Sequence, residues 1–326
     1  MKLLKTLYRI YSPSKKEVKM IRFIANYCKN IPDVTVRTDD IGNIYVTKGV
    51  SDSYPCVVAH TDQVQRLHPK DFTAIETRDI IIGYSPSTRQ QCGLGADDKN
   101  GIWIALRLLE KYPIMKAAFF MGEEIGCLGS EHADMAFFDD ARFVVQCDRR
   151  GHSDLITEIC CTELCSKEFL EAIDYKEYGY HIEHGLTTDV LTLKEKGLSV
   201  SCLNMSCGYY EPHTDNEFTV KKDLINALRF AEHIIESCQG IYSHQPVERY
   251  GYGCYGTAFD LEFDELYNEL WSILESNPDC SSQSVVRCYK EFYPHLKEAD
   301  VEMVYDMVKT ELDDYRRYSE EELGKI

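Results

Sequence analysis

The sequence predicts an α/β protein, with a mostly parallel mixed sheet flanked by helices and a small all-α appendage after it. Two observations predict the sheet: short apolar runs have the length of buried strands, and segments with helical periodicity separate several of them. A third predicts the appendage, because the last part of the chain has apolar residues at spacings of three and four on an acidic background. We therefore predict two domains, at 1–245 and 246–326.

The first 30 residues are predicted to be helical. An apolar stripe between Leu3 and Tyr8 predicts one helix, and Ser14 with Glu17 three residues later has the spacing of a capping box, which predicts a second helix as far as about Cys28. Five runs rich in β-branched and aromatic residues follow, and they predict strands at 34–38, 43–49, 54–60, 72–77 and 79–84.

Helices and strands then alternate along the chain. The predicted helices lie at 101–112, 130–138 and 220–238, and the predicted strands lie at 116–122, 141–147 and 198–205. In the appendage, helices are predicted at 261–275, 284–292 and 299–317. Apolar strands interleaved with helices are typical of parallel sheets whose helical connections cover both faces.

The net charge of −18 argues against nucleic acid or an anionic membrane as the main partner, since both attract basic surfaces. From residue 251 onward, 18 acidic residues face 7 basic ones, so this segment carries −11 of the total. Its helices are a candidate surface for a protein partner. The oligomeric state is not predicted.

The compartment predicted from composition is the cytoplasm. No apolar run reaches the roughly 18 residues that a membrane span requires, and the N-terminus lacks the pattern of a secretory signal. The fourteen cysteines are scattered without a CxxC pair, which favours reduced thiols over a disulfide framework.

Five short polar segments stand out because each follows or ends a predicted strand. They contain, in chain order, His60, Asp97, the pair Glu123 and Glu124, Asp148, and His213. Ligands of open α/β sheets bind at the carboxyl ends of the strands, so this placement favours a common site.

Taken singly, these segments have simpler explanations. Asp62 can orient the ring of His60, but His-x-Asp also occurs by chance. The acids at 97 and 98 could cap a helix beside a solvated Lys99. The two glutamates could lie in a solvated turn, although adjacent residues of an extended segment point to opposite sides and could serve two roles.

Taken together, the segments contain the ligands of two zinc ions that share one carboxylate. His60, Asp97 and Asp148 suit one ion, and Asp97, Glu124 and His213 suit the other. Glu123 is then free to act as a general base.

With these residues in place, the sequence resembles the co-catalytic di-zinc exopeptidase superfamily, which includes peptidase T and the leucyl and glutamyl aminopeptidases. The resemblance covers about residues 1–240. The similar segments are 12–17, DIGN at 40–43, HTD at 60–62, GADDKNG at 95–101, GEEIGCLGS at 122–130, the acid at 148, TTDVLTLKEKGLSVSCL at 187–203 and HTDNE at 213–217.

The resemblance implies roles for these residues. The five ligands become His60, Asp97, Glu124, Asp148 and His213. In the family the first acid of the GADD segment bridges the ions, which selects Asp97 over Asp98. Asp62 becomes the partner of His60, and Glu123 becomes the base. Asp189 lies near the site in relatives, and whether it lines the pocket here is left open.

The implied cofactors are two Zn²⁺ ions, with Co²⁺ or Mn²⁺ as alternatives, and the implied substrate is a peptide. The predicted reaction is hydrolysis of the N-terminal residue by a hydroxide that bridges the metals, with Glu123 as the base. Two alternatives stay open: a deacylase of N-acyl amino acids, and a scaffold that acts through its acidic C-terminal helices.

The sequence has no room for the inserted domains of two groups within this superfamily. Peptidase T-like enzymes insert a lid domain between the ligands that match Asp148 and His213, and tetrahedral glutamyl aminopeptidases insert a domain between those that match Asp62 and Asp97. Here these intervals are only 65 and 35 residues. We therefore predict a catalytic domain without an inserted lid.

Overall fold

The computed structural model describes most of the N-terminal part of the chain and short stretches of the C-terminal part. The described residues are 1–65, 68–159, 162–183, 185, 187–246, 266–267, 270–271, 273–274, 277–278, 280–286, 298, 301–310 and 312. Two compact units are present, at Met1–Glu248 and Arg249–Ile326.

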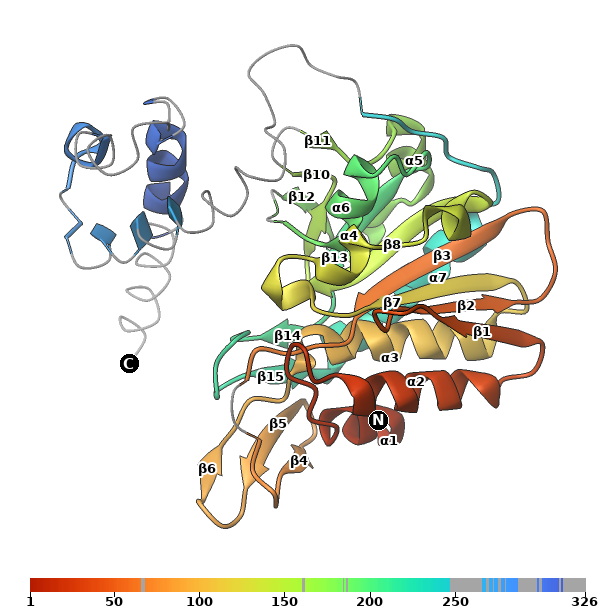
Figure 1. Cartoon of the computed structure of the whole chain (residues 1–326), viewed down its shortest axis with the longest axis horizontal. Helices are drawn as coiled ribbons and strands as arrows, with labels where there is room; N and C mark the ends of the chain where they lie inside the picture. The colour runs from red at the N-terminus through yellow and green to blue at the C-terminus, as the bar shows by residue number, and fades with distance from the viewer. Residues whose placement is uncertain are drawn as a thin grey trace. The chain divides into compact units, whose positions relative to one another are not determined.

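An eight-stranded mixed sheet organises the first unit (Figure 1). Its four central strands are parallel to one another and lie in the order β7 (Met115–Phe120), β3 (Tyr54–His60), β8 (Ala141–Arg149) and β13 (Cys202–Ser206). On one side, β2 (Ile44–Lys48) and β1 (Val34–Thr38) add antiparallel strands. On the other, β9 (Asp154–Ile156) pairs antiparallel with β13, and β12 (His181–Glu183) ends the sheet.

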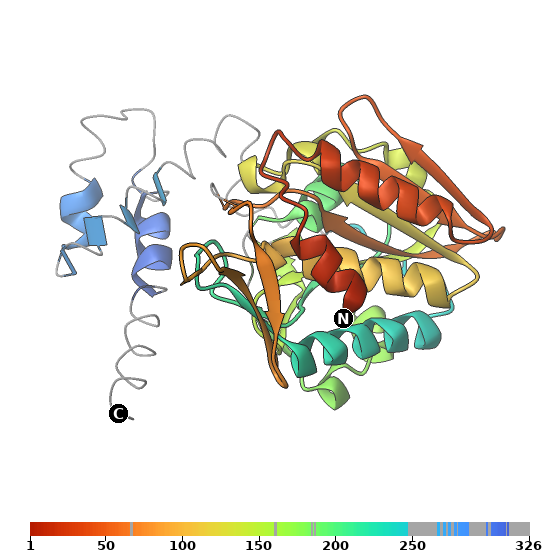
Figure 2. The ribbon, with the colours of Figure 1, turned by 90° about the horizontal axis from the view of Figure 1, so that it is seen from below.

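Helices cover both faces of this sheet, as the fold class predicts. In Figures 1 and 2, four helices pack along one face: α1 (Lys2–Tyr8), α2 (Val18–Lys29), α3 (Ala96–Lys111) and α7 (Lys221–Ser237). They bury alternate strand residues such as Val57 and Ala59. The intervening Cys56 and Val58 face a second apolar cluster, to which α6 (Asp189–Glu195) contributes. The predicted α/β class is confirmed.

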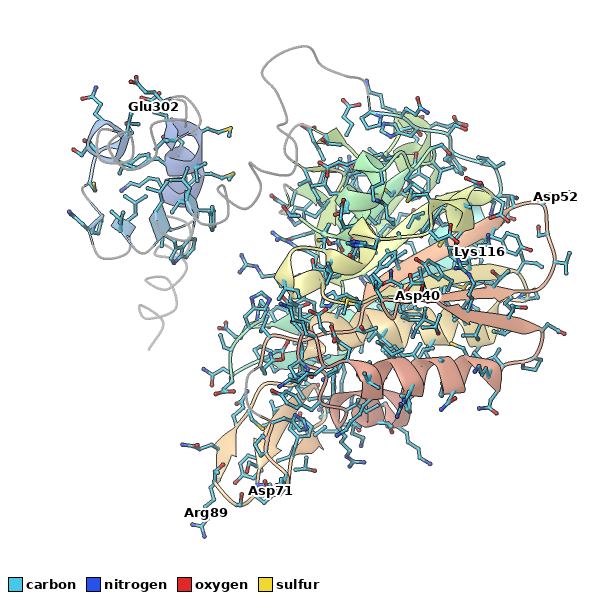
Figure 3. The ribbon with its side chains drawn as sticks, in the orientation of Figure 1. Asp40, Asp52, Asp71, Arg89, Lys116 and Glu302 are labelled. Atoms are coloured by element: carbon cyan, nitrogen blue, oxygen red, sulfur yellow. The ribbon has the colours of Figure 1, made fainter. Side chains whose placement is uncertain are left out.

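A smaller antiparallel sheet extends from the same unit. Its strands are β14 (Tyr209–Tyr210), β15 (Phe218–Val220), β5 (Ile80–Ser85), β4 (Thr73–Glu76) and β6 (Gln90–Gln91). Asp71 and Arg89 lie at its outer end (Figure 3). The loop between β14 and β15 carries His213, so this sheet brings a distant histidine to the edge of the main sheet.

The other elements are short. They comprise the helices α4 (Leu128–Glu131) and α5 (Lys167–Ala172), the 3₁₀ turns η1 (Glu123–Ile125), η2 (Met135–Phe138) and η3 (Tyr175–Tyr178), and the hairpin of β10 (Glu158–Ile159) with β11 (Thr162–Glu163).

The structure corrects several predicted element bounds. The capping box is wrong, because α2 begins only at Val18 and the Ser14 hydroxyl donates to Asp62 Oδ2 at 2.8 Å instead. The predicted helix at 130–138 divides into α4 and η2, and the predicted strand at 198–205 is confined to β13. A side chain that serves a partner 48 residues away cannot be recognised from local spacing.

The C-terminal unit has an apolar cluster of its own. Its buried members include Leu266, Leu270, Leu274, Val304 and Val308. The described residues within 266–274 and 301–312 are helical and lie inside the helices predicted at 261–275 and 299–317. The helical residues at 282–286 overlap the helix predicted at 284–292, and the rest of the predicted helices lies largely outside the described residues. The small helical C-terminal region is confirmed, whereas its binding to a protein partner remains a prediction. In the described part of the chain, no helix has the length and apolarity of a membrane span.

We expect the Phe119→Ala variant to lose about 3–5 kcal/mol of unfolding free energy, because Phe119 is fully buried on β7 and its truncation leaves a cavity. Urea denaturation measures this loss. The control is Val50→Ala, at a side chain that is 95% exposed, where a change within about 0.5 kcal/mol is expected. Equal effects in both variants would contradict this account of the core.

Candidate metal centre

The candidate residues converge at the carboxyl ends of the parallel strands. His60 is the last residue of β3, and Asp148 lies near the end of β8. Glu123 and Glu124 form η1 directly after β7. Asp97 lies in the first turn of α3, which packs against β3 and β8. His213 reaches the group from the β14–β15 loop.

The Asp97 carboxylate lies between the two histidines. Its Oδ1 is 3.0 Å from His60 Nε2, and its Oδ2 is 3.3 Å from His213 Nε2. Each carboxylate oxygen thus faces a different imidazole, which is the arrangement that a bridging carboxylate requires.

One further acid approaches each histidine. Asp148 Oδ1 is 3.6 Å from His60 Nε2, and Glu124 Oε2 is 3.2 Å from His213 Nε2. Two ligands of one tetrahedral zinc ion, with bonds of about 2.0–2.1 Å, lie about 3.3 Å apart. The structure therefore brings the five predicted ligands together, and each of the two histidines has two acids with oxygens 3.0–3.6 Å from its Nε2 atom.

Asp98 is the rival of Asp97 as a ligand. Among the described residues, two groups of three have potential ligand atoms within 4.8 Å of one another, and neither is a ligand set predicted for one ion: His60, Asp98 and Asp148, and His60, Asp97 and Glu124. Asp98, however, is fully buried and accepts the backbone N–H groups of His60 and Gly101, at 3.2 and 2.9 Å. Its oxygens thus have structural partners, whereas those of Asp97 face the histidines.

Asp62 connects His60 to the loop of the glutamates. Its carboxylate lies 3.2 Å from His60 Nδ1 and accepts the N–H groups of Glu123 and Glu124 at 3.0 and 3.3 Å. With Ser14 as a fourth donor, these hydrogen bonds lower the pKa of Asp62 although burial opposes the shift. A carboxylate at Nδ1 fixes the ring so that Nε2 faces the centre.

Glu123 also lies close to His60. Its Oε2 is 3.9 Å from His60 Nε2, and its side chain is only 13% exposed. Burial, with the nearby Asp148 carboxylate, raises the pKa of Glu123 well above its usual range. The preceding Gly122 has φ 63°, a left-handed conformation that favours glycine where the chain turns from β7 into η1.

The electrostatics of the group suit a cation. Burial, with the Asp97 carboxylate, raises the pKa of Asp148 to about 8. Hydrogen bonds with Asp97 and Glu124 raise the pKa of His213 to about 11. Burial and neighbouring carboxylates thus raise the pKa of Glu124 and Asp148, whereas the two histidines hold the pKa of Asp97 below its usual range. A divalent cation would compensate the charge while keeping all of these carboxylates deprotonated. Among the described residues, the buried Glu124 Oε1 has no hydrogen-bond partner.

Two residues near the centre differ from simple expectations. Lys99 is 1% exposed, so its interpretation as a solvated lysine is wrong. Glu217 is fully buried and accepts the N–H of Asp97 at 3.1 Å. Both residues lie in the resembling segments, but neither their sequence spacing nor their residue types indicate that both side chains are buried near the candidate site.

Asp189, whose role was left open, is fully buried and accepts a hydrogen bond from Ser130 Oγ at 2.5 Å.

Three solved structures that are similar to this chain are named as peptidases. An aminopeptidase PepT from Bacillus cereus matches with a TM-score of 0.59 and 14% identity over 73% of this chain and 97% of its own. A tripeptidase from Staphylococcus aureus has a TM-score of 0.57 and 14% identity, with coverages of 72% and 96%. An aminopeptidase from the archaeon Desulfurococcus kamchatkensis has a TM-score of 0.54 and 16% identity, with coverages of 78% and 98%. No family model and no curated protein matches the sequence.

These likenesses establish the fold of the first unit as that of the aminopeptidase and tripeptidase structures. The zinc-exopeptidase-like fold predicted from the motifs is thereby confirmed. The interval between Asp148 and His213 lies within the same compact unit as the rest of this fold.

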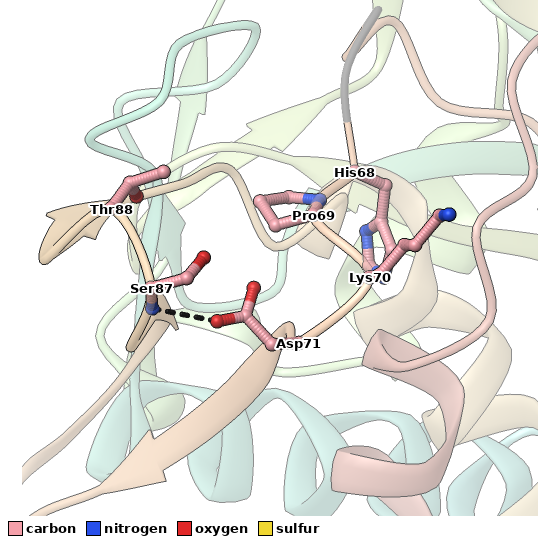
Figure 4. A pocket seen from close by; sticks show the side chains of 6 residues that line it. All are labelled: His68, Pro69, Lys70, Asp71, Ser87 and Thr88. Atoms are coloured by element: carbon pink, nitrogen blue, oxygen red, sulfur yellow. Dashed lines mark hydrogen bonds between the residues drawn. The ribbon is translucent and has the colours of Figure 1, made fainter.

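An open pocket of about 490 Å³ lies beside the small sheet (Figure 4). Its lining includes His68, Lys70 and Asp71, and Asp71 accepts the N–H of Ser87 at 2.7 Å. The imidazole of His68 stacks against Tyr11 and Phe72, with ring centroids 5.2 and 4.3 Å apart.

We expect His68 to titrate near pH 4 in NMR spectra, because burial and then the charges of Lys99 and Lys19 lower its pKa to about 4. The unfolded chain protonates this imidazole near pH 6.5, so the stability tied to neutral His68 is lost as the pH falls from about 6.5 to 4. A Lys19→Gln variant should raise the midpoint. A midpoint near 6.5 in the unaltered chain would contradict the burial argument.

Proposed function

We propose that this chain is a metal-dependent aminopeptidase that hydrolyses the N-terminal peptide bond of its substrates. The observation that carries the proposal is the Asp97 carboxylate, which faces His60 with one oxygen and His213 with the other. The peptidase fold of the similar structures supports it.

The donor set fits two ions of the zinc type, with Co²⁺ or Mn²⁺ as alternatives. His60, Asp97 and Asp148 would hold one, and Asp97, Glu124 and His213 the other. Bound there, such ions act as Lewis acids that polarise a carbonyl and neutralise developing negative charge.

Within this centre, we assign proton transfer to Glu123. Its carboxylate accepts a proton from the attacking water and returns it to the nitrogen of the leaving amine, so one water molecule and one amide give an acid and an amine. Asp62 holds the His60 ring and the Glu123 loop in fixed positions relative to each other.

The same centre would also support a deacylase of N-acyl amino acids, because metal ligands determine the chemistry and not the substrate. The two functions differ in whether the substrate amine is free. We expect release of p-nitroaniline from leucyl p-nitroanilide and none from its N-acetyl form. Preference for acylated substrates would contradict the aminopeptidase assignment.

We expect the Glu123→Gln variant to lose about 10²–10⁴-fold in turnover while keeping its metal content. The amide has nearly the same shape but cannot accept the proton. Turnover of leucyl p-nitroanilide and metal analysis of the same preparation are the two measurements. The matched control is Glu232→Gln on α7, a surface residue paired with Lys111, which should leave both unchanged.

Near-normal turnover in Glu123→Gln with full metal content would exclude Glu123 as the base. Loss of metal together with turnover would instead make Glu123 a ligand.

A further inference from the structure

A buried polar network lies beneath the bridging carboxylate and involves residues outside the proposed ligand set. It contains Gln63, Gln65, Lys99 and Glu217, each at most 6% exposed. These side chains come from three separate segments, which follow β3, begin α3 and precede β15. Such a network needs a partner for every polar atom, because an unpaired buried group is costly.

Glu217 holds the turn that carries Asp97. Its Oε1 accepts the backbone N–H of Asp97 at 3.1 Å, and its Oε2 accepts the N–H of Gly95 at 2.6 Å. The side-chain amide of Gln65 donates to Oε2 at 3.2 Å. Three donors surround this carboxylate, and an ionised carboxylate is the side chain that only accepts.

Lys99 closes the network from the other side of the turn. Its Nζ donates to Gln63 Oε1 at 2.5 Å and to the Leu94 carbonyl at 3.1 Å. Gln63 in turn donates to Gln65 at 2.9 Å, so the two amides connect the lysine with Glu217.

The turn between Leu94 and Asp97 requires glycine at position 95. Gly95 has φ 62°, and a Cβ at this position would lie 2.7 Å from Lys99 Nζ and 2.8 Å from the Gln63 side chain. Asp97 can face both histidines only while its backbone is held in this turn. Glu217 also lies four residues after His213, so the segment that supplies one histidine fixes the carboxylate between both.

We propose that Glu217 is a positioning residue, which orients Asp97 between His60 and His213 by binding the N–H groups on both sides of Ala96. This inference rests on the proposed function, because it assumes that Asp97 bridges two metal ions. It adds a residue that acts through the backbone and not through a ligand atom.

The test is metal binding by the full chain with the Glu217→Gln substitution. Glutamine keeps the shape but turns an NH₂ group toward the donors, so one N–H of the turn loses its acceptor. We expect Co²⁺ affinity, measured by calorimetry on metal-free protein, to fall about 10–100-fold. The visible absorption of bound Co²⁺ should also change, since it reports ligand geometry.

A matched control separates positioning from general stability. Lys194 is another buried lysine, which donates to the carbonyls of Leu198, Val200 and His244, ahead of the start of β13. Lys194→Met should lower Tm without changing Co²⁺ affinity or absorption. If Glu217→Gln does not fold, Gln65→Met removes one donor to Glu217 and should weaken Co²⁺ binding to a smaller extent.

The outcomes distinguish the inference from the function on which it rests. Unaltered Co²⁺ affinity and absorption in Glu217→Gln, or in Gln65→Met where the first variant does not fold, would overturn the positioning role and leave the metal centre standing. Failure of the unaltered chain to bind Co²⁺ would overturn the proposed function and this inference with it. A loss in Lys194→Met equal to that in Glu217→Gln would also overturn the inference, because general destabilisation would then explain both.

Discussion

The position of one carboxylate, that of Asp97, sets the arrangement of the whole candidate site. Its two oxygens face His60 at the end of β3 and His213 in the β14–β15 loop, and these residues are separated by more than 150 residues of chain. Everything near it serves to hold that position: β3 ends at His60, the small sheet delivers the His213 loop, and Glu217 binds the turn from below. The site thus depends on three segments that are distant in sequence and pack together at Asp97.

Burial of several carboxylates in one place has an electrostatic cost, and the structure shows how that cost is shared. Asp62 and Asp98 accept backbone N–H groups, although burial, with the Asp148 carboxylate, still raises the pKa of Asp98 well above its usual range. Asp97, Glu124 and Asp148 face the imidazoles, and Asp148 also accepts hydrogen bonds from other side chains. The acids thus share two kinds of donor, which are the backbone N–H groups of the loops and the side chains around the candidate site.

The fold explains how the strand ends at the candidate site are held in place. Both faces of the parallel strands are covered by helices, and the strands are almost completely buried, so their carboxyl ends are held by two apolar clusters. The similar peptidase structures share this frame at 14–16% identity. Packing of this kind depends on apolar character and volume more than on residue identity, which lets the frame persist while most side chains differ.

The sequence by itself determined the fold class and predicted a set of candidate site residues, because strand-length apolar runs, helical periodicity and polar residues at strand ends are local signals. His60, Asp97, Glu124, Asp148 and His213 could be grouped in this way, with the family resemblance selecting Asp97 over Asp98. Local signals could not show that Ser14 bonds Asp62 instead of capping a helix, or that Lys99 is buried. Nor could they show that Glu217 holds the Asp97 turn. Only the tertiary structure decided these points, because each depends on a partner that is distant in sequence and becomes adjacent only when the segments pack.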